Sequence, residues 1–171
     1  MVMPTRLARR SRSNPPSPAD WLRLESQLCF AVYSTSLALT KRYKPLLQPL
    51  DLTYPQYLVL LVLWQHDGLS VNQLGKQLFL DSGTLTPLLK RMETAGWLTR
   101  TRAFDDERRV IVSLAAAGKA LLPRAVSVAR HLAHSTGCST DELLALTRRL
   151  QELRRHLHDG ACVGTAAAQA H

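Results

Sequence analysis

The sequence predicts a mainly α-helical fold with one short β-hairpin, on three observations. Apolar residues recur with a period near 3.6 along most of the chain after residue 20, as they do on the buried face of a helix. Serine, threonine or aspartate precedes several of these segments and marks helix starts. The period changes only between residues 97 and 114, where two short apolar runs flank a charged turn.

The composition is that of a single globular domain with a basic surface. The chain has 171 residues, 46% of them hydrophobic and 20% charged, which is enough to bury a core. No apolar run approaches the ~18 residues of a membrane helix, and the N-terminus has no secretory pattern, so we expect a cytoplasmic protein with no membrane partner. The net charge of +9 favours an anionic partner, nucleic acid first.

The first two helices are bounded by proline and by a cap. The first is expected over residues 21–43, because the residue before Pro45 avoids the helical region. A short helical turn should follow around residues 46–50. Thr53 then begins a capping box, and the helix that follows runs through Trp64. This second helix is apolar nearly all round, which places it at the centre of the fold.

A second pair of helices follows a polar turn. Ser70 and Gln73 form another capping box and open the first helix of the pair. Asp81 caps the next helix, over residues 82–93, and Gly96 ends it in the left-handed conformation. The two helices are therefore joined by a short turn.

The chain continues with a hairpin and two closing helices. Strands are expected over residues 97–100 and 110–114, on either side of the polar turn 104–109. Helices over residues 116–133 and 140–158 complete the domain. Helix, turn, helix and a hairpin with a charged tip is the order of a winged helix-turn-helix module, which binds DNA.

In such a module the second helix enters the major groove, and its early residues reach base edges. Small polar residues there can read bases, basic residues on the next turns can contact phosphate, and arginines on the wing suit the minor groove. Taken alone, the wing is also compatible with a solvated turn, since its acidic residues cancel much of its charge; one of them is expected to pair with an arginine. The expected DNA-contacting residues are Ser82, Thr84, Thr86, Lys90, Arg91, Arg100, Arg102, Arg108 and Arg109.

Two stretches of the chain resemble a known family. Members of the MarR family of dimeric bacterial repressors have sequences similar to one stretch of this chain, LDSGTLTPLLKRMETAGWLTR followed by DDERRVIVSL. Members of its OhrR branch, the organic hydroperoxide sensors, have sequences similar to a second stretch, LCFAVYSTSLALTKRYKPLLQPLDLTYPQYLVLLVLW. The similarity covers residues 22–155. It implies a redox-sensing repressor that binds operator DNA as a homodimer and is released when organic hydroperoxide oxidises a cysteine.

The resemblance also implies which residues sense the oxidant. Cys29 matches the peroxide-reactive cysteine of the branch, and Tyr43 and Tyr54 match tyrosines that support its thiolate. Cys138 matches the second cysteine that some members use to resolve the oxidised one, in a disulfide across the dimer. Cys162 or a small thiol is the alternative resolving group.

The residues around Cys29 support a composite site, although a cysteine on an apolar helical stripe can equally be a core residue. Peroxide attack needs the thiolate. No basic residue lies at helical spacing from Cys29 and Glu25 opposes ionisation, which leaves phenol hydroxyls as donors. Tyr43 lies 14 residues further on, ~21 Å along a continuous helix, so a Tyr43 that meets Cys29, as the resemblance implies, must come from a second copy of the chain. Tyr33, one turn away, is expected only to pack, and Phe30, Leu58 or Val59 are expected to line the pocket.

This interpretation divides the chain into five parts. Residues 1–18 form a disordered basic arm, either a solvated tail or a weak phosphate-binding segment. Residues 19–52 form the N-terminal helix and the dimer and sensor region, and residues 53–114 form the winged helix-turn-helix. Residues 115–158 supply the C-terminal dimerisation helices, and residues 159–171 form a flexible tail.

Other chemistry is not expected. The pairs His131/His134 and His156/His158 have no third ligand nearby in the sequence, so no metal site is predicted. No P-loop or dinucleotide fingerprint is present, and no cofactor or enzymatic activity is expected. Three alternatives remain open: a MarR-like repressor released by a phenolic or aromatic ligand, a thiol peroxidase that uses Cys29 and Cys138, and a non-specific nucleoid protein.

Overall fold

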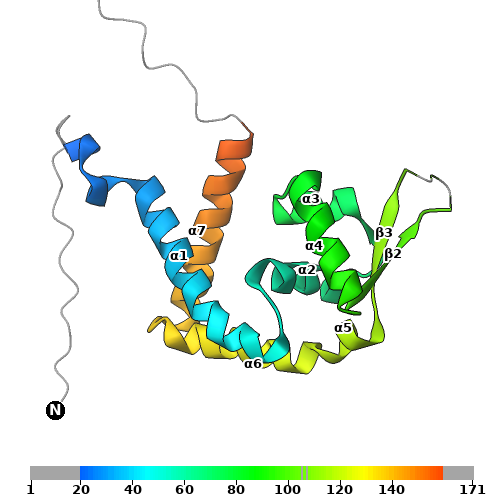
Figure 1. Cartoon of the computed structure of the whole chain (residues 1–171). Coiled ribbons are helices and arrows are strands. Elements are labelled where there is room, and N and C mark those ends of the chain that lie inside the picture. The colour runs from blue at the N-terminus through cyan, green and yellow to red at the C-terminus, as the bar shows by residue number, and fades with distance from the viewer. Residues whose placement is uncertain (1–19, 105, 107, 160–171) are drawn as a thin grey trace, which may run out of the picture. The chain divides into compact units, whose positions relative to one another are not determined.

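The computed structural model describes residues 20–104, 106 and 108–159 (Figure 1). The expected basic arm, residues 1–18, lies outside the described residues, as does the expected tail beyond Asp159. The chain divides into two compact units, residues 1–42 and 43–171.

In the first unit, residues 20–42 form two short 3₁₀ turns and most of a long helix. The turns are η1 (Asp20–Leu22) and η2 (Leu24–Ser26), and the helix is α1 (Leu28–Leu47). Arg23 and Gln27 are both extended and interrupt the helical path. The prediction that one helix starts at residue 21 was therefore wrong, because apolar periodicity does not detect extended backbone at single positions.

The expectation that Pro45 ends the first helix was also wrong. Pro45 lies inside α1, which continues to Leu47, in the second unit. In the last turn a proline removes only one intrahelical hydrogen bond. Leu47 is 1% exposed, and Leu50, at the end of η3 (Gln48–Leu50), is also buried. Burial of these two leucines offsets the lost bond.

Helix α2 (Tyr54–Gln65) lies at the centre of the second unit, as predicted. Thr53 caps it in a capping box with Gln56. Four of its residues are 1% exposed or less, namely Tyr57, Val59, Leu60 and Leu63. Val59, one of the residues expected to line the sensor pocket, is fully buried, and Leu58 beside it is half-buried.

The predicted helix pair is present as α3 (Val71–Leu78) and α4 (Ser82–Thr94). Ser70 caps α3 with the predicted capping box, and Asp81 caps α4. Gly96 has φ +75°, the left-handed conformation that was expected after α4. Phe79, between the two helices, also has a positive φ of 55°.

The hairpin forms two strands of a small antiparallel sheet. Strand β2 (Leu98–Arg102) pairs with β3 (Val110–Leu114), with Leu98 opposite Leu114. A third strand, β1 (Leu69–Ser70), adds to the other edge of β3 and gives the order β1-β3-β2. The sequence did not indicate β1, because two residues are too few for an alternating pattern.

After the sheet, the described residues form α5 (Ala116–Ala120), α6 (Leu122–Ser135) and α7 (Thr140–His158). The bounds of α7 match the prediction. The single helix expected over residues 116–133 is divided at Leu121, because Pro123 stands in the first turn of α6 and restarts the helix there. Within the described ranges, no single helix is long and apolar enough to cross a membrane; only the bent pair of residues 28–50 and 54–65 meets that test by length and composition.

Candidate functional site

Helix α4 presents a polar surface opposite a buried face. Leu85, Leu88, Leu89 and Met92 are buried in the core of the second unit. On the other side Ser82, Thr84, Lys90 and Arg91 are exposed, and Thr86 is half-buried. The predicted residues of this helix are therefore accessible, Thr86 only in part.

The cap of α4 fixes its first turn. The Asp81 carboxylate accepts a hydrogen bond from the Thr84 backbone N–H, at 2.9 Å, and another from the Thr84 hydroxyl, at 2.8 Å. These hydrogen bonds hold the pKa of Asp81 below its usual value. Since the hydroxyl proton of Thr84 is committed to the cap, Thr84 is left with acceptor capacity toward a ligand.

A carboxylate from α4 holds the first arginine of the wing. Glu93 Oε1 accepts from the Arg100 backbone N–H at 3.0 Å, and Oε2 accepts from Nε and Nη2 at 2.9 and 2.7 Å. Arg100 belongs to β2, so this ion pair joins the wing to α4. A partner for the wing arginines was expected only among the tip residues; Glu93, seven residues before Arg100, gave no local signal.

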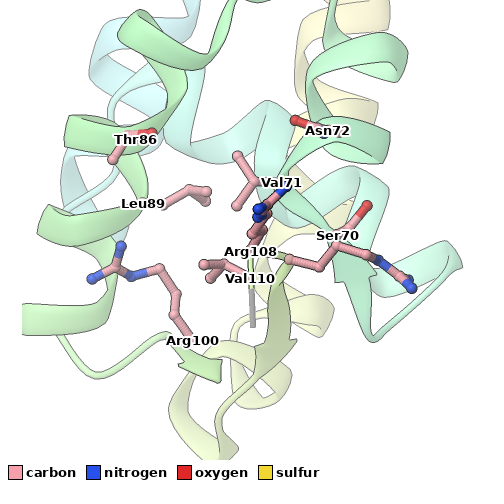
Figure 2. Close-up of a pocket in the computed structure, with 9 residues that line it drawn as sticks. Ser70, Val71, Asn72, Thr86, Leu89, Arg100, Arg108 and Val110 are labelled. Atoms are coloured by element: carbon pink, nitrogen blue, oxygen red, sulfur yellow. The ribbon is translucent and has the colours of Figure 1, made fainter. Parts of the chain in front are cut away.

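The wing and the helix pair enclose a pocket of about 210 Å³ (Figure 2). Figure 2 shows Arg100 beside α4 and Arg108 nearer the middle of the pocket, with Thr86 above them. Arg109 also lines it, whereas Arg102 is exposed on β2. At the tip, Asp106 accepts a hydrogen bond from the Arg108 backbone N–H at 2.9 Å. Asp105 and Glu107, the other acids considered as arginine partners, lie outside the described residues.

The Glu93–Arg100 pair makes stability depend on pH. Side-chain hydrogen bonds from Arg100 lower the pKa of Glu93 in the folded protein from its usual 4.5. The ion pair therefore stabilises the fold fully at pH values above the unfolded pKa. This stabilisation is lost as the pH falls through the lowered pKa of the folded state. At neutral pH, Glu93→Gln should melt a few degrees below the wild type, and the difference should vanish in acid. Thermal melts across pH test this, with Glu152→Gln on exposed α7 as control. A difference that does not change with pH would contradict it.

The two described cysteines are both exposed. Cys29 is the second residue of α1, in its first turn, and not in the middle of a helix as its apolar neighbours suggested. The positive end of a helix dipole lies at such a turn. Cys138 precedes Ser139, which caps α7 in a capping box with Glu142. Cys162 lies outside the described residues.

The two predicted tyrosines lie against each other. The ring centroids of Tyr43 and Tyr54 are 4.6 Å apart, and both residues are half-buried. Burial, followed by the neighbouring Tyr54 and Tyr57, raises the pKa of Tyr43 to about 12, so its hydroxyl keeps its proton and can donate. Tyr57 was not singled out in the sequence, although its position three residues after Tyr54 on a helix gave a signal. Its ring lies 5.7 Å from that of Tyr43.

The described residues contain no group of three histidine, cysteine, aspartate or glutamate side chains placed to hold a metal ion. The histidine pairs of α6 and α7 therefore have no additional described ligand that would complete a site.

Comparison with known proteins identifies relatives along most of the chain. The organic hydroperoxide resistance transcriptional regulator of Bacillus subtilis (strain 168) is 48% identical over 139 residues, covering 81% of this chain and 95% of that protein. The family model for the transcriptional regulator SarA/Rot matches residues 41–124.

The fold is similar to that of AbfR of Staphylococcus epidermidis. The crystal structure of overoxidised AbfR bound to DNA has a TM-score of 0.68 and 34% identity, and the match covers 82% of this chain and 99% of AbfR. The structure of the disulfide-formed AbfR has a TM-score of 0.58 and 34% identity, over 79% and 95% of the two chains.

The helix pair, the small wing sheet and these relatives define a winged helix-turn-helix transcriptional regulator, not an enzyme. The chain belongs to the MarR family of such regulators, and its relatives include a regulator of organic hydroperoxide resistance.

Proposed function

We propose that this protein is a redox-sensing repressor that binds operator DNA as a homodimer and is released when an organic hydroperoxide oxidises Cys29. Cys138 is the resolving thiol. The observation that carries the proposal is the contact of Tyr43 with Tyr54, two half-buried phenols side by side, in a chain that also has an exposed cysteine at a helix start.

The chemistry takes place in two steps. The Cys29 thiolate attacks the peroxide oxygen, the O–O bond breaks, and with one proton the products are a sulfenic acid and an alcohol. The Cys138 thiol then attacks the sulfenic sulfur, which forms a disulfide and releases water. Tyr43 and Tyr54 support the first step by donating hydrogen bonds to the thiolate.

The dimer supplies the tyrosines. Cys29 and Tyr43 lie on the same helix, α1, 14 residues apart, or ~21 Å along its axis. A tyrosine side chain does not span that length, so the phenols that reach Cys29 belong to the other subunit. Exposed apolar side chains fit an interface that one chain alone does not cover; they include Leu28, Phe30, Val32, Leu37 and Leu39 on α1 and Leu144, Leu146, Leu150 and Leu157 on α7.

The DNA contacts follow from the exposed surface of α4 and from the wing. Ser82, Thr84 and Thr86 face base edges in the major groove, and Lys90 and Arg91 contact phosphates. Arg102, Arg108 and Arg109 extend along the minor groove. Glu93 holds Arg100 against α4. Arg100 therefore sets the direction of the wing, and it contacts the DNA backbone near the base of the wing.

The test is fluorescence anisotropy on a duplex from the region upstream of the protein's own coding sequence. Reduced wild type should bind, an organic hydroperoxide should release it, and dithiothreitol should restore binding. Cys29→Ser should bind and not respond, whereas Cys162→Ser should respond like the wild type. Equal release of wild type and Cys29→Ser would contradict the proposal and favour a regulator released by a small ligand.

A further inference from the structure

One of the two proposed sensor tyrosines, Tyr43, contacts a third aromatic residue that is too buried to meet an oxidant itself. Tyr57 is 1% exposed and lies on the buried face of α2. Its ring centroid is 5.7 Å from that of Tyr43, with an angle of 44° between the planes. Tyr43 in turn lies 4.6 Å from Tyr54. The ring of Tyr43 therefore contacts both a half-buried ring and a fully buried one.

Tyr57 is fixed from its other side as well. Its ring meets the Trp64 ring edge to face, at 6.5 Å. Trp64 Nε1 donates a hydrogen bond of 3.0 Å to the carbonyl oxygen of Gly118 in α5. Aromatic pairs at these separations prefer offset and edge-to-face arrangements, which restrict ring orientation. The position of Tyr57 is thus set by α5, at the base of the wing.

Ring position decides whether a phenol can act on a thiolate. A hydrogen bond from a hydroxyl weakens steeply with a change in distance or angle. Tyr54 is the first residue of α2 and Tyr43 lies about one turn before the end of α1, so both residues are close to a helix end. A rigid surface beneath the rings would keep their hydroxyls in one place.

From these contacts we propose that Tyr57 is a positioning residue, which holds Tyr43 and Tyr54 where they support the partner subunit's sensor thiolate. The inference rests on the proposed function, since it assumes that this tyrosine pair serves Cys29. Tyr57 acts through its ring and not through its hydroxyl. Tyr57→Phe should therefore preserve the effect, and Tyr57→Leu should remove it.

The test uses the full-length dimer in a Cys138→Ser, Cys162→Ser background, so that Cys29 is the sole thiol. The rate of alkylation by iodoacetamide is measured against pH, because only the thiolate reacts. Tyr57→Leu should move the midpoint of this profile upward by about one pH unit, which is about tenfold in thiolate fraction. Tyr57→Phe should leave the midpoint in place. Leu63→Ala, a cavity in the same buried face of α2 that keeps all three rings, is the control for general loss of stability.

Two results would overturn the inference: an unchanged midpoint in Tyr57→Leu, or an equal shift in Leu63→Ala. Tyr43→Phe and Tyr54→Phe separate this failure from failure of the proposed site. If they shift the midpoint and Tyr57→Leu does not, the tyrosines support Cys29 without help from Tyr57. If neither shifts it, the phenols do not serve the thiol, and both proposals fail.

Discussion

Replacing Gly118 with alanine will severely destabilise the DNA-binding unit. A Cβ at this position would overlap the carbonyl oxygen of Trp97 and would lie 3.0 Å from the carbonyl carbon and 3.2 Å from a methyl group of Leu114. The Trp97 carbonyl already accepts a hydrogen bond from the Ala115 N–H at 3.1 Å. Backbone cannot move aside as a flexible side chain can, so α5 must separate from the start of β2.

The separation should also break the Trp64 hydrogen bond to the Gly118 carbonyl. Overpacking together with lost hydrogen bonds costs about 4 kcal/mol, or ~10 °C in melting temperature for a chain of this size. Thermal unfolding followed by circular dichroism at fixed protein concentration measures the loss. Ala117→Ser, one residue away on the exposed face of α5, should change the melting temperature little. A Gly118→Ala protein that melts like this control would disprove the close approach.

Gly118 shows why local signals predict only part of this fold. In the sequence it is a glycine in a helical pattern, a weak helix former and nothing more. Its importance comes from Trp97, 21 residues earlier, whose carbonyl lies against it. The predicted caps Thr53, Ser70 and Asp81 depend on neighbours three residues away. Those caps could be predicted because their chemistry is contained in the local sequence.

The errors in the predicted elements have the same origin. Pro45 was expected to end a helix on local grounds, but Leu47 is drawn into the core and the helix continues. Strand β1 exists because Leu69 and Ser70 pair with β3, about 40 residues later. Long-range contacts override local propensity in each case.

Some residues of the candidate site could be predicted from the sequence and others could not, for a related reason. The residues of α4 follow from helix period and residue type, and the sensor residues follow from resemblance to a family. Glu93 and Tyr57 were missed, because their roles depend on which side chain lies opposite them in space. Arg100 meets Glu93 across the junction of α4 and β2, and Tyr57 meets Tyr43 across the junction of α1 and α2. Neither contact has a fixed sequence spacing; the spacing of Tyr57 from Tyr54 indicated only that the two residues share a helix face.

Replacing Cys138 with serine will uncouple oxidation from DNA release, if the proposed disulfide is the signal. Cys138 immediately precedes Ser139, the cap of α7, and its backbone N–H donates to the Thr136 hydroxyl at 3.2 Å. A bond at Cys138 therefore pulls directly on the first turn of α7. At the other end of this helix, Arg154 lies over the ring of Phe79, 4.2 Å from its centroid. Phe79 forms the turn between α3 and α4, so a displacement of α7 would act on the DNA-binding helices.

With peroxide, wild type should form a dimer that is covalently linked on a non-reducing gel, and its affinity for the operator should fall at least about tenfold. Cys138→Ser should form no linked dimer. Its Cys29 should instead gain two or three oxygen atoms by mass spectrometry, while DNA affinity stays within about threefold of the reduced protein. Cys162→Ser serves as the matched control and should behave as wild type. Release of Cys138→Ser to the wild-type extent would assign the signal to oxidation of Cys29 alone, and a linked dimer in this variant would transfer the resolving role to Cys162.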